Sequence, residues 1–174
     1  MTLEQVLAFL RANQPMPNFP DPNRMQHYRD VVTYLHHHPD PACLPYLIHS
    51  FSAFADWKIY DRVQAVICCF RKSLVLPALI DGMKSPHFSV RFWSADTARF
   101  MPDEALIPHL EILLAESSPE IRMVAVAALE TIDSPRVRYI VREALTREDD
   151  GDVVDVMRDL IGETGSEFGG SPGF

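Results

Sequence analysis

The sequence has too few cysteines for a disulfide framework. Its 174 residues include only Cys43, Cys68 and Cys69. An odd number, with two of the three adjacent in an apolar run, does not fit the paired cysteines of small secreted domains. The first residues also lack the basic start and apolar stretch of a signal peptide. We therefore expect a reducing, cytoplasmic setting.

Long apolar runs and an excess of positive charge are also missing. No stretch of about 18 apolar residues is present that could span a membrane. Lys and Arg total 16 against 24 Asp and Glu, which gives a net charge of −8. Residues 1–100 carry a net +2, whereas residues 101–174 carry a net −10. Because nucleic-acid binding requires clustered cations, we expect neither a nucleic-acid partner nor a membrane. The acidic half is interpreted as a solubilising surface or a surface that meets a basic protein.

The patterns of common catalytic and metal sites are absent as well. The histidine run 36–38 places side chains about 100° apart on a helix, so they cannot converge on one metal ion. The segment 66–70 around Cys68 is apolar and supplies no base to activate a thiol. The carboxylates of 148–152 lack EF-hand spacing and are interpreted as a solvated loop. No glycine-rich phosphate loop occurs. We expect no enzymatic activity, no metal and no cofactor.

Helical patterns account for the N-terminal part of the chain. Thr2 and Gln5 are spaced as a capping box for a helix that runs to about residue 13. Four prolines between residues 14 and 22 predict an extended connection. A second helix is expected over 23–37, where apolar residues recur at helical spacing. We interpret residues 1–39 as an N-terminal helical cap.

A unit of 31 or 32 residues repeats from about residue 40 onward. Each unit has a proline that we expect near the start of its first helix, at Pro45, Pro77 and Pro108. Each expected second helix has an arginine three positions before a small residue. These arginines are Arg62, Arg91 and Arg122, and the small residues are Ala65, Ser94 and Ala125. Small residues at a fixed point allow neighbouring helices to approach closely.

The repeat resembles the HEAT-repeat family, and more closely the short bacterial HEAT-like repeats of proteins related to phycobilin lyases. The residues that carry this resemblance are Leu106-Ile107-Pro108-His109-Leu110, Ser118-Pro119-Glu120-Ile121-Arg122 and Ala125-Val126-Ala127-Ala128-Leu129. The resemblance implies an all-α fold, an α-α superhelix or solenoid of antiparallel helix pairs. It implies one domain over 1–164, with about four repeats in 40–164, and the Gly/Ser-rich composition of 165–174 separately predicts a flexible tail. It also implies that Arg62, Arg91 and Arg122 form a structural ladder with acidic or backbone partners in neighbouring repeats.

The second helices of a solenoid usually line its concave surface, where partners bind. On the second helix of the repeat 74–104, we expect Phe92, Asp96 and Arg99 to face outward. An aromatic group surrounded by charge is typical of an interface hot spot. The candidate partner-binding residues are Trp57, Tyr60, Phe92, Asp96, Arg99 and Met123. In the alternative interpretation, the aromatic residues of this region pack between repeats.

These observations favour a non-enzymatic protein–protein interaction module. An adaptor or an inhibitor-like protein fits, for example an immunity-type protein that neutralises a bacterial toxin. The resemblance leaves a bilin-lyase-like enzyme or chromophore chaperone as the alternative, although nothing in the sequence isolates a tetrapyrrole pocket. A nucleic-acid-binding HEAT-like protein is disfavoured by the net charge. We expect a monomer whose partner is another protein.

Overall fold

The computed structural model describes residues 1–52 and 57–163. Its α-helices are α1 (Leu3–Arg11), α2 (Pro22–His37), α3 (Leu44–His49), α4 (Trp57–Cys68), α5 (Lys72–Gly82), α6 (Phe88–Ala98), α7 (Ile107–Leu113), α8 (Pro119–Glu130), α9 (Pro135–Leu145) and α10 (Gly151–Ile161). Short 3₁₀ turns over Pro41–Cys43 and Glu104–Leu106 lead into α3 and α7. The described residues contain no strand, so the predicted all-α class is confirmed.

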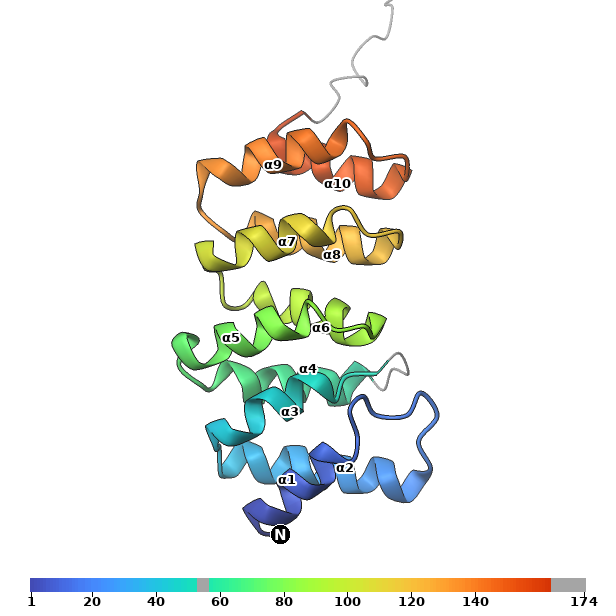
Figure 1. The fold of residues 1–174 in the computed structure, drawn as a ribbon, viewed down its shortest axis with the longest axis vertical. Helices are drawn as coiled ribbons and strands as arrows, with labels where there is room; N and C mark the ends of the chain where they lie inside the picture. Colours follow the sequence, from blue (N-terminus) through green and yellow to red (C-terminus); the bar gives the residue numbers. More distant parts are fainter. Residues whose placement is uncertain (53–56, 164–174) are drawn as a thin grey trace, which may run out of the picture.

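The helices form an elongated stack with α1 and α2 at one end and α9 and α10 at the other, as Figure 1 shows. Four pairs follow one another along the stack: α3 with α4, α5 with α6, α7 with α8, and α9 with α10. The helix α1 packs on α3, and α2 packs on α4, which closes the N-terminal end. The predicted solenoid of antiparallel helix pairs is therefore confirmed.

One side of the stack is formed by the second helix of each pair. We call the exposed surface of α2, α4, α6, α8 and α10 the second-helix face. The helix α8 packs directly against both α6 and α10, whereas α5, α7 and α9 have few contacts with one another. The closest helix contacts between repeats of the C-terminal half therefore lie on the side of α6, α8 and α10. The second helices of a solenoid usually line its binding face.

The start of α1 follows the local sequence signal. The Thr2 side chain accepts a hydrogen bond from the Gln5 backbone N–H, and the Gln5 side chain accepts one from the Thr2 backbone N–H. The predicted capping box is thus present, and it satisfies two N–H groups that a helix end leaves without partners. Farther along the chain, the Ser118 side chain caps α8 by accepting a hydrogen bond from the Ile121 backbone N–H.

The repeated prolines do not all occupy the same helix position. Pro45 and Pro108 lie in the first turn of α3 and α7, as predicted. Pro77 instead lies inside α5, because that helix already begins at Lys72. A proline inside a helix leaves the carbonyl four residues earlier without its partner. Here that residue is Ser73, and both it and Pro77 are exposed, so water can replace the missing hydrogen bond.

A close approach between helices occurs at Gly82. A Cβ atom at this position would collide with Ser94 Oγ and would lie 2.7 Å from Ile48 Cγ2. Gly82 therefore allows α5 to contact both α6 and α3. Ser94 itself is fully buried. The prediction that a small residue at 94 permits close helix packing is confirmed, although its neighbour is a glycine on the first helix of the same pair.

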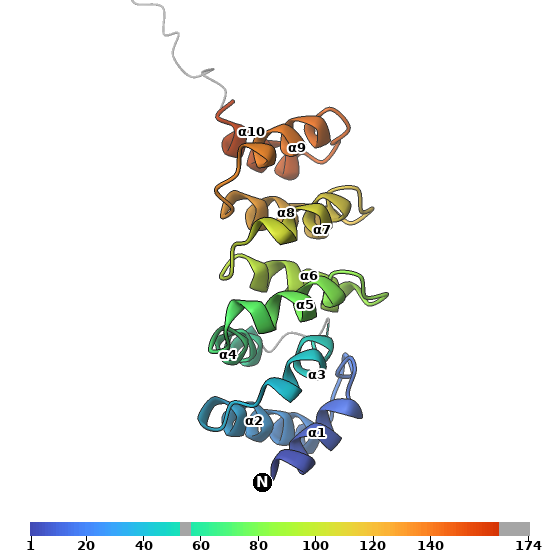
Figure 2. The ribbon, with the colours of Figure 1, turned by 60° about the vertical axis from the view of Figure 1, so that its left-hand side comes forward.

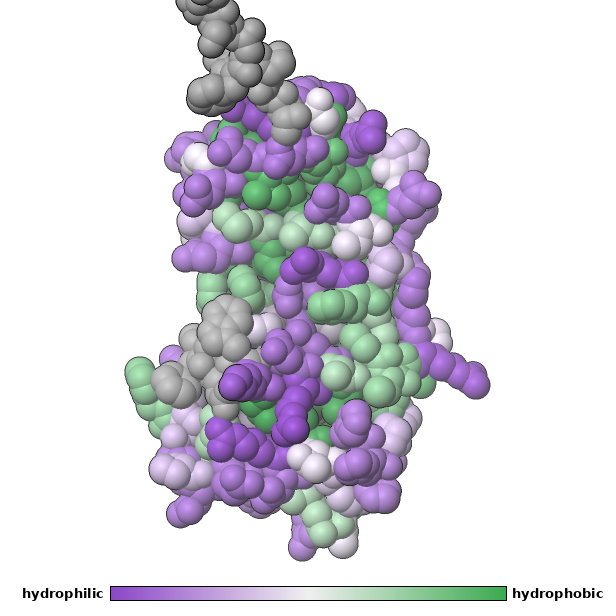
Figure 3. Space-filling view, turned by 180° about the vertical axis from the view of Figure 1, so that it is seen from behind, coloured by the Kyte–Doolittle hydropathy of each residue, from purple (hydrophilic) through white to green (hydrophobic). Residues whose placement is uncertain are grey.

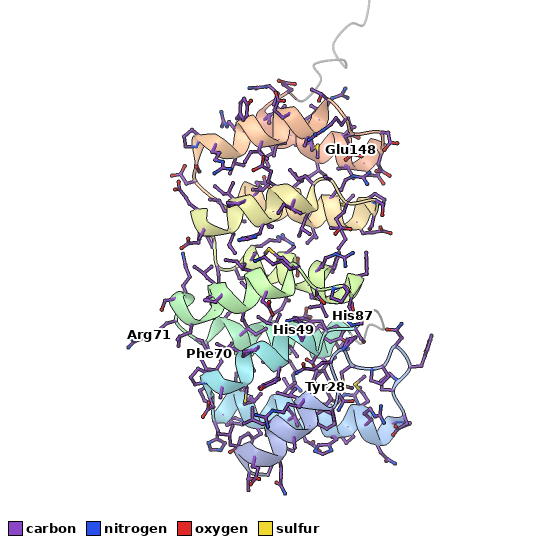
Figure 4. The ribbon with its side chains drawn as sticks, in the orientation of Figure 1. Tyr28, His49, Phe70, Arg71, His87 and Glu148 are labelled. Atoms are coloured by element: carbon purple, nitrogen blue, oxygen red, sulfur yellow. The ribbon has the colours of Figure 1, made fainter. Side chains whose placement is uncertain are left out.

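The proline-rich connection between α1 and α2 packs onto α3. Met16 is 2% exposed, and its backbone N–H donates to the Ser50 carbonyl at 3.1 Å. The Ser50 hydroxyl also lies 2.7 Å from the hydroxyl of Tyr28, a residue of α2 labelled in Figure 4. Burial raises the pKa of Tyr28 far above its ordinary value, so the phenol stays neutral. Ser50, at the C-cap of α3, thus links both the connection and α2 to α3.

The buried positions define how successive repeats correspond. All buried residues of α6 except Ser89 match buried residues of α8 at a constant shift of 31 residues. The helix α4 matches α6 at a shift of 30, which pairs Tyr60 with Val90, Gln64 with Ser94 and Ile67 with Thr97. The helices α4 and α6 have few direct contacts with each other. Figure 2 shows α4 nearly end-on, whereas α6 lies across the view. The stack therefore changes direction between these two helices.

Candidate protein-binding face

Two phenylalanines of α6 form the aromatic part of the second-helix face. Phe88 and Phe92 are one helical turn apart, and their rings are stacked with centroids 6.1 Å apart. Phe88 is 41% exposed, and Phe92 is half-buried. The rings of Trp93 and Phe92 meet edge to face with their centroids 5.5 Å apart, and Trp93 holds the Phe92 ring on the core. A rigidly supported aromatic pair that remains accessible is typical of a protein-binding hot spot.

Tyr60 does not belong to this exposed surface. The side chain is 1% exposed, and its ring packs against Phe51 and Trp93 at centroid distances of 5.2 and 5.1 Å. Its hydroxyl accepts a hydrogen bond from the Ser52 backbone N–H and lies 2.7 Å from the Ser52 hydroxyl. Because Tyr60 faces the core, its assignment to the partner-binding set is corrected. The side chain of Trp57, another member of that set, lies outside the described residues.

Asp96 joins α4 to α6 instead of standing free on the surface. One carboxylate oxygen accepts a hydrogen bond from Gln64 Nε2 at 2.7 Å, and the other accepts one from Arg99 Nη1 at 3.0 Å. The Gln64 amide also donates to Thr97 Oγ1 at 3.2 Å. Asp96 therefore orients Arg99, whose side chain is 46% exposed. Of these groups, the Arg99 guanidinium is the most accessible to a partner.

Met123 extends the face onto the next repeat. The shift of 31 residues between α6 and α8 places it at the position equivalent to Phe92. Its side chain is half-buried and packs against the core. A methionine can adapt its shape to a partner, because its side chain is unbranched and polarizable. The structure thus places Phe92 and Asp96 on α6, Arg99 at the C-cap of α6 and Met123 on α8. Figure 3 views the molecule from the side of these second helices.

Arg91 and Arg122 form equivalent links between repeats. Arg91 donates to the Ser85 carbonyl at 2.8 Å and pairs with Glu116, while Arg122 donates to the Glu116 carbonyl at 2.8 Å and pairs with Glu148. In each case, the guanidinium holds the loop before its own helix and a carboxylate of the next repeat. The bridge between Arg122 and Glu148 is bidentate, with bonds of 2.7 and 2.6 Å. Glu148 is labelled near α10 in Figure 4.

The Arg122–Glu148 bridge is shielded from water. The Glu148 side chain is 2% exposed, and that of Arg122 is 11% exposed. Hydrogen bonds from Arg122 hold the pKa of Glu148 below its ordinary value, despite the opposing effect of burial. The Glu148 carboxylate also accepts hydrogen bonds from the backbone N–H groups of Asp149 and Asp150. The acidic loop at this point is therefore partly a structural element.

Arg62 does not continue this ladder. The shift of 30 residues places Arg62 at the position of Phe92, and it places Asp61 at the position of Arg91. Arg62 is exposed and forms no ion pair within residues 1–52 and 57–163. The small residue predicted to mark close helix packing, Ala65, is exposed too. The sequence alignment at a spacing of 29 residues is one position out of step with the shift of 30, which accounts for the position of Arg62. The shift of 30 does not account for Ala65, because it places this exposed residue opposite the buried Ala95.

The described residues offer no assembled metal or thiol centre. Among these residues, no group of three or more His, Cys, Asp or Glu side chains is placed to hold a metal ion. All three cysteines are free, and burial raises the pKa of Cys43 to about 11 and raises that of Cys68. A raised pKa keeps a thiol protonated and therefore weakly nucleophilic. In the same part of the chain, no helix is long and apolar enough to cross a membrane.

The fold and the face together define an α-solenoid with a candidate docking surface. Residues 76–160 match the family model for HEAT repeats, which supports the resemblance seen in the sequence. HEAT repeats generally mediate protein–protein interaction and typically act as non-catalytic scaffolds. None of the curated proteins compared with the chain is significantly similar to it.

The interpretation of the sequence missed Phe88. Its spacing of four residues from Phe92 was the available signal, since residues at i and i+4 share a helix face. It also missed the side on which Arg62 lies, because the offset between repeats could not be derived from arginine spacing alone. Burial, and not residue identity, defines which positions of α4 and α6 are equivalent.

Proposed function

We propose that the chain is a non-enzymatic protein-binding module, and that its second-helix face contacts the partner through Phe88, Phe92, Arg99 and Met123. The observation that carries this proposal is the stacked pair of Phe88 and Phe92, accessible on α6 and supported from below by the buried Trp93. Aromatic and arginine side chains contribute most strongly to interfaces when the scaffold already holds them in place.

An adaptor or an inhibitor-like protein is the form of this function that we favour, with an immunity-type protein that neutralises a toxin as the concrete case. The net charge of −8 supports a partner that presents basic surface to the C-terminal half. We further propose that residues 1–164 form a single domain that acts as a monomer. The three free cysteines support a reducing, cytoplasmic location.

Site-specific photo-cross-linking tests the proposed face. A photoreactive phenylalanine analogue replaces Phe88 in one variant and Tyr139 in a matched control, and both variants are produced in cells of the source organism. Tyr139 is a suitable control because it is 66% exposed and lies on α9, a first helix. We expect a discrete protein adduct from position 88 and none from position 139.

The identified partner is then purified and titrated against variants of the face. Phe92→Ala combined with Arg99→Glu should weaken binding by at least about 100-fold, or 2.7 kcal/mol, because a hot-spot aromatic and a charge are lost together. Thermal denaturation of the same variant shows whether the fold is kept. An adduct formed only from position 139, or unchanged affinity in the folded double variant, would place the interface elsewhere.

A further inference from the structure

A basic groove runs between α2 and α4 on the second-helix face. One part, with a volume of about 180 Å³, has an apolar floor of Val32, Ala65 and Val66 and a polar rim of His36, His37 and Arg62. A second, wider part of about 360 Å³ continues past Arg62 to Lys58 and Arg29. Arg62 lines both parts, so the two hollows are adjacent. We call them together the α2–α4 groove.

The charge of this groove is of one sign. Three of its lining side chains are cationic and none is a carboxylate. Arg62 and Lys58 are exposed, and neither forms an ion pair with any other residue that the structure describes. Arg29 has an interaction of its own, so Arg62 and Lys58 supply the unpaired charge of the groove.

Elsewhere on the second helices, the two arginines of the ladder are neutralised. Arg91 is paired with Glu116, and Arg122 is paired with Glu148. The C-terminal half carries a net −10, so the unpaired positive charge of α4 stands out in an acidic protein. Grouped, unpaired cations above an apolar floor supply both the charge and the desolvated contact that an anionic ligand needs.

We propose that the α2–α4 groove binds an acidic peptide segment of a partner protein. Carboxylates of the segment pair with Arg62 and Lys58, and one of its apolar side chains covers Val32, Ala65 and Val66. This inference deepens the proposed function and rests on it, because the groove lies on the same face as Phe92 and specifies the chemistry of the partner. A groove with an apolar floor and few cations fits a peptide better than a nucleic-acid backbone, which requires a longer series of cations.

Fluorescence anisotropy with synthetic peptides tests the groove on the full chain. The probe is a short labelled peptide in which Glu and Asp flank a single Leu, and its counterpart has Gln and Asn in place of the acids. The critical variant is Arg62→Glu. The matched control is Arg138→Glu, which reverses another exposed arginine on α9, far from α2 and α4.

We expect the acidic peptide to bind at least about tenfold more tightly than its amide counterpart, and the difference to shrink as salt screens the charges. Arg62→Glu should abolish most of this preference, whereas Arg138→Glu should change it less than about twofold. Equal binding of the two peptides, or an equal loss in both arginine variants, overturns the proposal. Tighter binding of an oligonucleotide of the same charge, lost in Arg62→Glu, assigns the groove to nucleic acid instead and also overturns it.

The binding role of the groove and that of the aromatic surface can be refuted independently. If the acidic peptide does not bind but position 88 gives a partner adduct, only the groove assignment is wrong. If the peptide binds and depends on Arg62 but no adduct forms at position 88, the aromatic surface is wrong and the groove stands. A dimer in sedimentation that Arg62→Glu converts to a monomer would show that a second copy of the chain occupies the groove, which contradicts an external partner.

Discussion

Replacing Glu148 with Gln tests how strongly the α8–α10 end depends on one shielded ion pair. Glu148 accepts two hydrogen bonds from Arg122 and two from backbone N–H groups, and its side chain is 2% exposed. Glu148→Gln keeps the size of the side chain and an oxygen that can accept from the backbone N–H groups, but it removes the charge. It also turns an amide NH₂ or a neutral oxygen toward a guanidinium whose side chain is 11% exposed.

The expected cost is about 2–3 kcal/mol of unfolding free energy at pH 7. Removing one partner of a fully buried ion pair costs about 3–5 kcal/mol, and an exposed pair contributes about 0–1 kcal/mol. The Arg122–Glu148 bridge lies near the buried limit, but two backbone hydrogen bonds survive in the variant. Urea denaturation of both proteins at several pH values measures the difference.

The pH dependence gives an independent check with a defined sign. The folded pKa of Glu148 is lowered, mainly by hydrogen bonds from Arg122. A lowered pKa means that this carboxylate stabilises the fold fully above its unfolded pKa and that this contribution is lost as the pH falls through the folded pKa. The deficit of Glu148→Gln should therefore be largest at neutral pH and shrink in acid, below the ordinary Glu value of 4.5.

Two outcomes would refute this reasoning. One is a variant whose unfolding free energy lies within about 0.5 kcal/mol of the parent at pH 7, which would give the bridge the strength of a surface pair. The other is a deficit that stays constant into acid, which would assign the loss to packing and not to charge. Glu163→Gln provides the matched control, because its bridge to Arg142 is 3.4 Å long and about half exposed on both sides.

Three further substitutions test the packing and the position of the arginines. Gly82→Ala should destabilise the protein by about 1–3 kcal/mol in thermal denaturation, because the new methyl group overlaps Ser94 Oγ, whereas Gly151→Ala meets no atom within 4 Å and should be tolerated. Tyr60→Phe should cost about 1–3 kcal/mol through the hydrogen bonds lost to Ser52, and an unchanged melting temperature would contradict this. Arg62→Ala should leave the unfolding free energy within about 0.5 kcal/mol of the parent, while Arg91→Ala should lower it by about 1–2 kcal/mol; equal effects would restore Arg62 to the ladder.

Local signals made the architecture predictable from the sequence. The capping box at Thr2, the repeated prolines and the 31-residue spacing each act within one helix or between equivalent helices. The partners of Arg91 and Arg122 follow the same periodicity, because a carboxylate lies 25 or 26 residues after each arginine. Such regular features are repeated in the chain and can be recognised without coordinates.

The binding face was less accessible to this reasoning, because it depends on helix rotation. A one-residue change in the alignment turns a helical side chain by about 100°, which is enough to move it from the core to the surface. Tyr60 and Arg62 were both affected: the tyrosine is buried, and the arginine lines the groove. The position of Asp96 was hard to predict for another reason. Its hydrogen bond from Gln64 joins two repeats of unequal spacing.

The sequence by itself determined the helical class, the repeat length and the absence of the usual catalytic motifs, because these depend on residue types at short spacing. Only the tertiary structure decided which side of each helix faces water. The change of direction between α4 and α6 brings Gln64 to Asp96 and leaves Arg62 in the α2–α4 groove. Packing between repeats sets this rotation, and packing is a property of the whole stack instead of any single repeat.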